Sequence, residues 1–192
     1  MIRATQDDAR ERRQIELFDL IPLQGRSNKY IPDAKILIDG EEHRIELKTS
    51  DVIRKQVSTA RNITISKLDE YKNVHWVFSQ YRKTKNGFEF TGEHYYAHGR
   101  QLKPWLDKQQ KTIMEGTKTY GGLELWGEAK RHLQKLLDES KITKLDNVFT
   151  KRGGLNDPKI SWNEIKNMCV KIDMNNPAKH LRELCKGATN IK

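Results

Sequence analysis

The chain has 192 residues, of which 35% are hydrophobic, enough for one domain with a core of its own. Its 36 Lys and Arg outnumber its 26 Asp and Glu, and the formal net charge of +10 favours a polyanionic partner, most often nucleic acid. There is no apolar run of about 18 residues and no signal-peptide pattern, so we expect a cytoplasmic protein with no membrane partner. Cys169 and Cys185 are expected to be reduced thiols, because neither has a companion at convincing zinc spacing.

The first predicted elements are a helix and a hairpin. Apolar residues at helical spacing predict a helix of roughly four turns from about residue 5 to Ile21, ahead of Pro22. Residues 30–38 and 43–49 alternate like strands on either side of Asp39-Gly40, a dipeptide typical of tight hairpin turns. Together they predict an antiparallel pair.

A helix and further strands follow the hairpin. Residues 51–63 are polar and irregular, and residues 64–73 read as a short helix. The stretch "VHWVFSQY" at 74–81 predicts a buried strand. The stretch "GFEFTGEHYYA" at 87–97 predicts either a strand pair or one extended segment.

The second half of the chain is mainly helical in pattern. Residues 102–142 carry an apolar stripe between Trp126 and Leu137, which fits either a dimer interface or a helix packed on its own domain. A basic glycine-containing loop precedes a helical tail from Asn163. The order of elements predicts a single domain, 1–192, of the α/β (mixed α+β) class. We expect a central mixed β-sheet flanked by helices, with a helical elaboration at about 102–145.

The hairpin places charged residues on one face. With a two-residue turn, opposing residues have numbers that sum to 79, so Asp33 lies opposite Glu46 with β-carbons about 4.5–5.5 Å apart. Because side chains alternate, Lys48 shares the face of Glu46, and Lys35 and Arg44 point the same way. The other face takes the apolar residues Ala34, Ile36, Ile38, Ile45 and Leu47. Leu37 is the exception, an apolar residue on the polar face.

This charged face suits a metal site. Two carboxylates so close repel each other unless a positive charge lies between them, and Mg²⁺ is commonly held by one or two carboxylates plus waters. Asp33 and Glu46 are therefore the predicted metal ligands. Lys48 is predicted to orient or deprotonate an attacking water, or to stabilise charge that develops on a phosphorus centre. The alternative is a solvated strand face with cross-strand ion pairs.

At these residues the sequence resembles the PD-(D/E)xK nuclease superfamily. Pro32-Asp33 matches the first motif element and Glu46-Leu47-Lys48 the second. The later order of "VST", a short helix, "VHWVFSQYR" and "LNDPKISWNEIKNMCVKI" is similar to that of a type II restriction endonuclease in this superfamily. The matching segments cover about half of the chain. One departure is that Ala60-Arg61-Asn62 stands where the related enzyme has a run of histidines that touch bases or the scissile phosphate.

The resemblance implies a restriction-endonuclease-like fold and a Mg²⁺-dependent homodimer that cuts both strands of double-stranded DNA at a short palindrome. It makes Asp33 and Glu46 the metal ligands and Lys48 the catalytic lysine. A cognate DNA methyltransferase is then expected in the host. Residues 105–150 hold more helix than the related enzyme has, which leaves the dimer interface open.

Residues 53–64 are the predicted DNA-reading segment. Arg bonds both acceptors of guanine and Asn or Gln does the same for adenine, so Arg61 and Asn62 are the first base-contact candidates, followed by Gln56 and Ser58. Basic residues elsewhere are expected to contact phosphates. The phosphate candidates are Lys35, Arg44, Arg54, Lys55, Lys151, Arg152 and Lys159. The alternative for the segment is a solvated polar loop.

Two rival functions stay open from the sequence. A repair or junction-resolving nuclease of the same superfamily would need little base reading, and the donor-rich segment at 53–64 argues mildly against it. A non-catalytic DNA-binding module would gain nothing from Asp33 and Glu46, because unneutralised acids weaken binding to a polyanion.

Overall fold

The computed structural model describes residues 6–23, 32–59, 63–120 and 157–189. The chain divides into two compact units that each combine distant segments. The first unit contains Met1–Val57, Lys72–Leu102 and Ile160–Lys192, and the second contains Ser58–Tyr71 and Lys103–Lys159. The single domain expected from the sequence stays a prediction.

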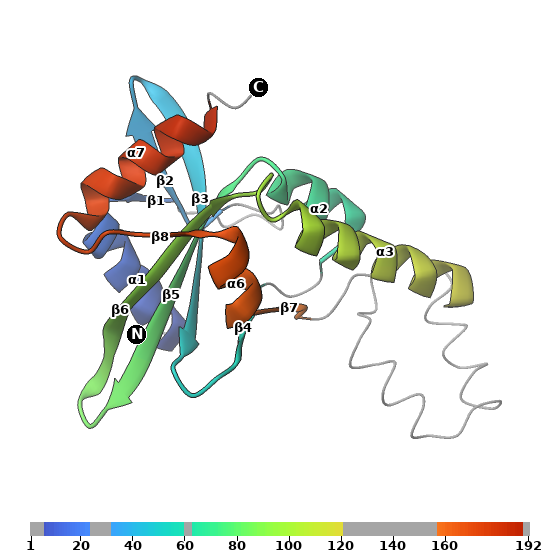
Figure 1. Ribbon diagram of the computed structural model, residues 1–192, viewed down its shortest axis with the longest axis horizontal. Helices are drawn as coiled ribbons and strands as arrows, with labels where there is room; N and C mark the ends of the chain where they lie inside the picture. The colour runs from blue at the N-terminus through green and yellow to red at the C-terminus, as the bar shows by residue number, and fades with distance from the viewer. Residues whose placement is uncertain (1–5, 24–31, 60–62, 121–156, 190–192) are drawn as a thin grey trace, which may run out of the picture. The chain divides into compact units, whose positions relative to one another are not determined.

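A six-stranded mixed sheet forms the centre of the first unit (Figure 1). In sheet order, its strands are β1 (Ile21–Pro22), β2 (Ala34–Ile38), β3 (Glu41–Asp51), β5 (His75–Thr84), β6 (Gly87–His98) and β8 (Val170–Lys171). β3 and β5 run parallel, whereas the other neighbouring pairs run antiparallel. The predicted class, mixed α/β with a central mixed sheet and flanking helices, is confirmed.

The turn between β2 and β3 sets the register of this sheet. Asp39 and Gly40 have φ angles of 52° and 84°, both in the left-handed region that such two-residue turns require. Ile38 consequently pairs with Glu41, and the pairing continues to Ala34 opposite Ile45. The predicted register is confirmed.

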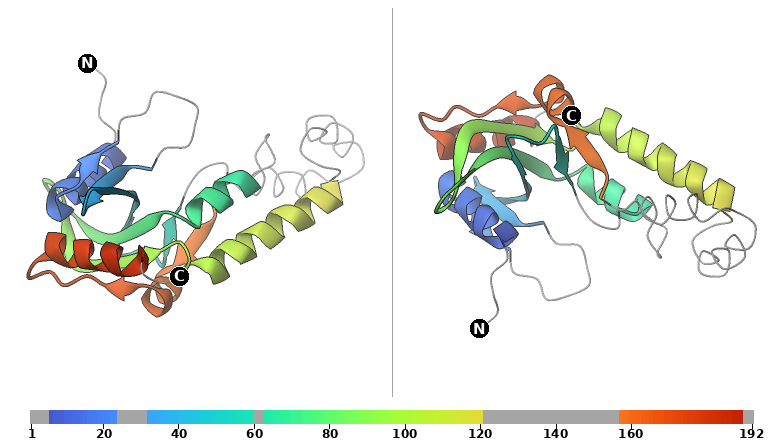
Figure 2. Two further views of the ribbon diagram at one scale, coloured as in Figure 1. Left: turned by 90° about the horizontal axis from the view of Figure 1, so that it is seen from above. Right: turned by 90° about the horizontal axis from the view of Figure 1, so that it is seen from below.

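One face of the sheet carries the hydrophobic core. The helices α1 (Gln6–Phe18) and α7 (Pro177–Thr189) pack against this face, as Figure 2 shows from two sides. The buried cluster comprises Phe18, Leu20, Ala34, Ile36, Ile45, Leu47, Val77, Tyr96, Ile172, Leu181, Cys185 and Ala188. The apolar residues predicted for this face are therefore in the core or, like Ile38, packed against it, and Leu37 is exposed as expected.

The first helix is shorter than predicted. It ends at Phe18, because Asp19 adopts a left-handed φ of 51° and stops the helical hydrogen bonds. Ile21-Pro22 then forms β1 against Ala34 and Lys35. The prediction of a helix as far as Ile21 is wrong.

Two later segments also differ from the prediction. Residues 87–97 form a single long strand, β6, paired with β5 through a turn at which Thr84 faces Gly87. The tail from Asn163 is not one helix. The helix α6 (Trp162–Met168) starts at a capping box of Ser161 and Glu164 and stops where Cys169 turns extended, and β8 then separates it from α7.

The second unit contains α2 (Ile65–Tyr71) and α3 (Lys103–Tyr120), which contact each other. Apart from the six-stranded sheet, the short strands β4 (Gln56–Ser58) and β7 (Lys159–Ser161) pair as a two-stranded sheet that is not assigned to the second unit as a whole. The predicted stripe at Trp126–Leu137 lies outside the described residues. Among the helices that the structure describes, none is long and apolar enough to cross a membrane.

Three histidines lie together in the first unit. His43 Nδ1 is 3.2 Å from His75 Nε2, His75 Nδ1 is 2.8 Å from the Tyr96 hydroxyl, and the rings of His75 and His98 lie 4.9 Å apart. Burial, together with the nearby His98 and His43, lowers the pKa of His75 to about 3. His75 is therefore neutral in the folded protein at pH 7.

This cluster predicts that acid destabilises the fold. The unfolded chain takes up the His75 proton near pH 6.5 and the folded chain only near pH 3, so the free energy of unfolding falls as pH drops through that window. The slope is about 1.4 kcal/mol per pH unit for one proton. Urea denaturation between pH 7 and pH 4.5 measures it, and His75→Gln should lower the slope by about that amount. Burial also lowers the pKa values of His94 and His98, so some dependence on pH should remain. Equal slopes in wild type and His75→Gln would contradict the prediction.

Candidate active site

Asp33, Glu46 and Lys48 come together where β2 begins beside β3. Asp33 precedes β2, and its Oδ2 accepts a hydrogen bond of 2.8 Å from the Leu47 backbone N–H. This carboxylate therefore takes the place of a backbone acceptor at the end of the β2–β3 pairing. The bond orients Asp33 toward the strand that carries the other two residues.

The ammonium of Lys48 is surrounded by three oxygen atoms. Lys48 Nζ lies 2.7 Å from Glu46 Oε1 and 3.4 Å from Asp33 Oδ2, and it donates a hydrogen bond of 2.9 Å to the Leu47 carbonyl. The two carboxylates predicted from the hairpin thus converge on one point. The Leu47 carbonyl was missed, because no side-chain pattern marks a backbone oxygen.

Because these charged side chains are largely buried, they interact strongly with one another. The side chain of Glu46 is only 4% exposed, while those of Lys48 and Asp33 are 15% and 23% exposed. Burial alone would lower the pKa of Lys48, but the carboxylates of Glu46 and Asp33 outweigh it and raise the pKa well above its ordinary value. With both carboxylates facing it, Lys48 is a charged ammonium, and its predicted roles toward an attacking water and a phosphate stay predictions.

The residues fit a magnesium ion by their chemistry. Two carboxylates and one ammonium leave the group with one excess negative charge, and the oxygens that contact the ammonium are the hard ligands that Mg²⁺ prefers. A metal ion held by all three oxygens would take the place that Lys48 Nζ occupies, so the ammonium would have to move aside. No group of three or more His, Cys, Asp or Glu that could hold a metal occurs in the described part of the chain. A site of two carboxylates and a carbonyl suits Mg²⁺, which keeps several of its waters.

Aromatic residues border the same face of the sheet. In the parallel register, Glu46 pairs with Trp76 and Lys48 with Phe78 on β5. The two rings are fully buried and stacked, with centroids 5.7 Å apart. They give the charged residues an apolar boundary on one side, where electrostatic interactions are stronger than in water.

Lys35 and Arg44 share the face of the site, as predicted, but both pair with a third residue. Glu42 lies 2.8 Å from Lys35 and 3.5 Å from Arg44. The hydrogen bond from Lys35, with the charge of Arg44, holds the pKa of Glu42 below its ordinary value. The sequence interpretation missed Glu42 as their common partner, and their role as phosphate contacts stays a prediction.

The predicted DNA contacts are only partly described. Arg54, Lys55 and Gln56 are exposed after β3, whereas Ser58 is half-buried and donates a hydrogen bond of 3.1 Å to Asp157. Lys159 is exposed in β7. Arg61, Asn62, Lys151 and Arg152 lie outside the described residues.

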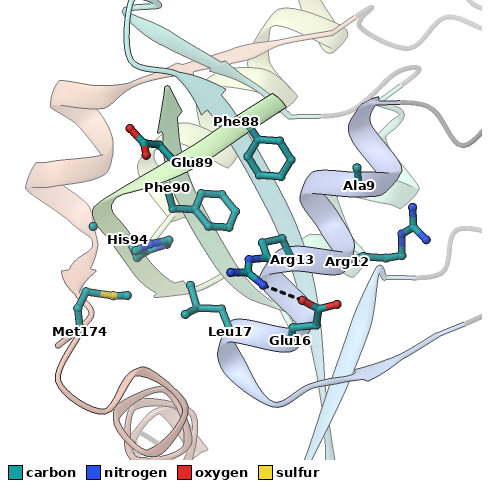
Figure 3. A pocket seen from close by; sticks show the side chains of 11 residues that line it. Ala9, Arg12, Arg13, Glu16, Leu17, Phe88, Glu89, Phe90, His94 and Met174 are labelled. Carbon is teal, nitrogen blue, oxygen red and sulfur yellow. Dashed lines mark hydrogen bonds and ion pairs between the residues drawn. The ribbon is translucent and has the colours of Figure 1, made fainter. Parts of the chain in front are cut away.

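A pocket of about 740 Å³ lies elsewhere, lined by α1, β6 and Met174 (Figure 3). Arg12 and Arg13 from α1 border it, and Arg13 pairs with Glu16 across 3.2 Å. Because α1 covers the core face, this pocket is on the side of the sheet opposite Glu46 and Lys48. It has no part in the candidate site.

No protein-family model matches the sequence, and no curated protein matches it either.

The buried ion pair predicts a strong energetic coupling between Lys48 and Glu46. Lys48→Met should lower the free energy of unfolding by about 3 kcal/mol, because it leaves two carboxylates without their shared cation. Adding Glu46→Gln should recover much of that loss, and urea denaturation of the four proteins in this double-mutant cycle measures the coupling. Lys35→Met is the matched control, because its partner Glu42 is more exposed and the loss of stability should be much smaller. Additive effects of the Lys48 and Glu46 changes would contradict the prediction.

Proposed function

We propose that this protein is a type II restriction endonuclease of the PD-(D/E)xK superfamily, which hydrolyses both strands of double-stranded DNA with Mg²⁺. The observation that carries the proposal is the convergence of Asp33, Glu46 and the Leu47 carbonyl on the Lys48 ammonium. The motif supplies these residues in the order expected of the superfamily. The mixed sheet, whose strands β3 and β5 run parallel between antiparallel neighbours, supports the same assignment.

The roles of the residues follow from charge and position. Asp33, Glu46 and the Leu47 carbonyl would hold the metal ion, which supplies Lewis-acid polarisation of a phosphate oxygen and a more acidic bound water. Lys48 lies beside the same carboxylates, where it would orient or deprotonate the attacking water or stabilise negative charge that develops on the phosphate. The buried rings of Trp76 and Phe78 limit water on one side of these charges.

The proposed substrate is duplex DNA, and the proposed assembly is a homodimer. The net charge of +10 supports a polyanionic substrate. Cutting both strands of a palindrome calls for two sites related by twofold symmetry, which a homodimer provides. A restriction enzyme also needs a cognate methyltransferase in its host, which we therefore include in the proposal.

The cleavage test is digestion of plasmid and phage DNA with and without Mg²⁺. The wild type should give discrete bands only with the metal, whereas Asp33→Asn, Glu46→Gln and Lys48→Met should lose about a thousandfold or more in rate. Asp33→Asn keeps a side-chain oxygen for the Leu47 N–H, so it separates chemistry from folding. Circular dichroism checks the fold of each variant, and Lys179→Ala on α7 serves as the control that should cut normally.

Three results would overturn parts of the proposal. Near-normal cutting by Glu46→Gln or Asp33→Asn would remove the assigned site. Cutting of branched or mismatched DNA alone would favour the repair-nuclease alternative. Binding without any cutting would favour the non-catalytic DNA-binding module.

DNA affinity should depend on salt through the exposed lysines. Lys55→Ala should weaken binding to cognate and random duplexes alike, and lower the slope of log affinity against log salt by about one. Arg61→Ala, at a predicted base contact, should instead reduce the preference for the cognate site. Fluorescence anisotropy without Mg²⁺ measures both, with Lys179→Ala as the control. An unchanged slope for Lys55→Ala would contradict its assignment as a phosphate contact.

A further inference from the structure

Ile53 is an exposed apolar residue that lies two residues after β3 ends at Asp51. It is 82% exposed, and its neighbour Val52 is 37% exposed. Single exposed apolar residues are common on protein surfaces, so exposure by itself says little. Two further observations point to a role for Ile53: the hydrogen bonds that hold its loop, and the charged residues beside it.

The side chain of Asp51 holds the turn that presents Ile53. Asp51 is 4% exposed, its Oδ1 accepts a hydrogen bond of 3.2 Å from the Ile53 N–H, and its carbonyl accepts one of 2.9 Å from the Arg54 N–H. The Val52 N–H donates to the Tyr81 carbonyl across 2.7 Å. Ile53 therefore projects from a turn whose backbone is fixed on both sides.

The end of the loop, at Lys55 and Gln56, is also held by hydrogen bonds. The Ser50 hydroxyl donates to the Gln56 carbonyl across 2.9 Å, and the Trp162 N–H donates to the Lys55 carbonyl across 3.1 Å. The loop between β3 and β4 is thus tied to β3, β5 and α6 (Figure 1). These hydrogen bonds already hold the loop in the folded protein. Binding of a partner to Ile53 therefore carries no further entropic cost for ordering the loop.

The loop continues the strand that carries the candidate site. β3 runs three residues beyond Lys48 to Asp51, which corresponds to about 10 Å of extended chain. Adjacent base pairs of duplex DNA are about 3.4 Å apart. Where a duplex lies along β3 with a phosphate at Lys48, bases about three pairs away lie beside the end of the strand, near the turn that presents Ile53.

The charges beside Ile53 favour DNA over a second protein chain. Arg54 and Lys55 are exposed directly after it, and the whole chain carries a net charge of +10. A second copy would bring the same cations to the contact, and like charges repel. In DNA, phosphates complement the two cations, and the thymine methyl group is the apolar feature that the major groove offers to a side chain.

We propose that Ile53 reads DNA by packing against a thymine methyl group in the major groove, with Arg54 and Lys55 on the adjacent phosphates. This inference rests on the proposed function, and it adds an apolar, specificity-determining contact to the polar candidates at 53–64. The contact makes the enzyme prefer thymine over uracil at one position near the cut.

The test compares thymine with uracil, which differs from it only by lacking that methyl group. The kcat/KM values of wild type and Ile53→Ala are measured on duplexes that contain the cleavage site and thymine-rich flanks on either strand. Each thymine within five base pairs of the cut is replaced by uracil in turn. We expect uracil at one position to slow the wild type about tenfold, and Ile53→Ala to be slow on both duplexes and indifferent to that replacement.

The control is Leu37→Ala, at another exposed apolar residue, 47% exposed in β2. It should keep the wild-type preference for thymine. Equal sensitivity to uracil in wild type and Ile53→Ala would overturn the inference, as would the absence of any uracil effect. Loss of a wild-type dimer by Ile53→Ala in sedimentation velocity would overturn it in favour of a contact between copies.

A binding measurement separates failure of this inference from failure of the proposed function. Anisotropy without Mg²⁺ is recorded on the same thymine and uracil duplexes. If the wild type cuts nothing but binds the thymine duplex more tightly, and Ile53→Ala loses that difference, the contact holds and the nuclease assignment fails. If the wild type neither cuts nor binds, both are overturned.

Discussion

The buried charge of Glu46 is the constraint on which the first unit depends. A carboxylate with 4% of its side chain exposed is costly to bury unless a cation lies beside it, and Lys48 supplies that cation at 2.7 Å. Asp33 then shares the same ammonium, so the group keeps one more negative than positive charge. The stability of the fold and the proposed binding of a metal ion place opposite requirements on this charged group. The fold needs the ammonium in place, whereas the excess negative charge attracts a further cation.

The charged group and the hydrophobic core lie on opposite faces of the sheet. Ile45 and Leu47 on β3 belong to the core beneath α1 and α7, while Glu46 and Lys48, which alternate with them, belong to the opposite face. The parallel pairing of β3 with β5 extends the division, because Val77 joins the core while Trp76 and Phe78 lie beside the charged residues. The pocket at α1 and the proposed site are consequently separate features of one sheet.

The hairpin and the grouping of Asp33, Glu46 and Lys48 were predictable because they follow from local rules. A two-residue Asp-Gly turn and strict alternation determine which side chains share a face. Other features depend on bonds between distant segments, which alternation does not encode. The Ile53 loop is fixed by Tyr81 and Trp162, which lie far along the chain. The early end of the first helix depended on the left-handed backbone at one residue, Asp19, which an apolar pattern does not mark.

The turn at Asp39-Gly40 also restricts how the two strands of this hairpin can pair. A slip of the pairing by one residue there would move each side chain of β3 to the opposite face against a fixed β2. Glu46 and Lys48 would enter the core in place of Ile45 and Leu47, and both the apolar cluster and the charged group would be lost together. The two left-handed residues of this exposed turn therefore help to determine which face of the sheet carries the charged group, although they lie several residues from it along the chain.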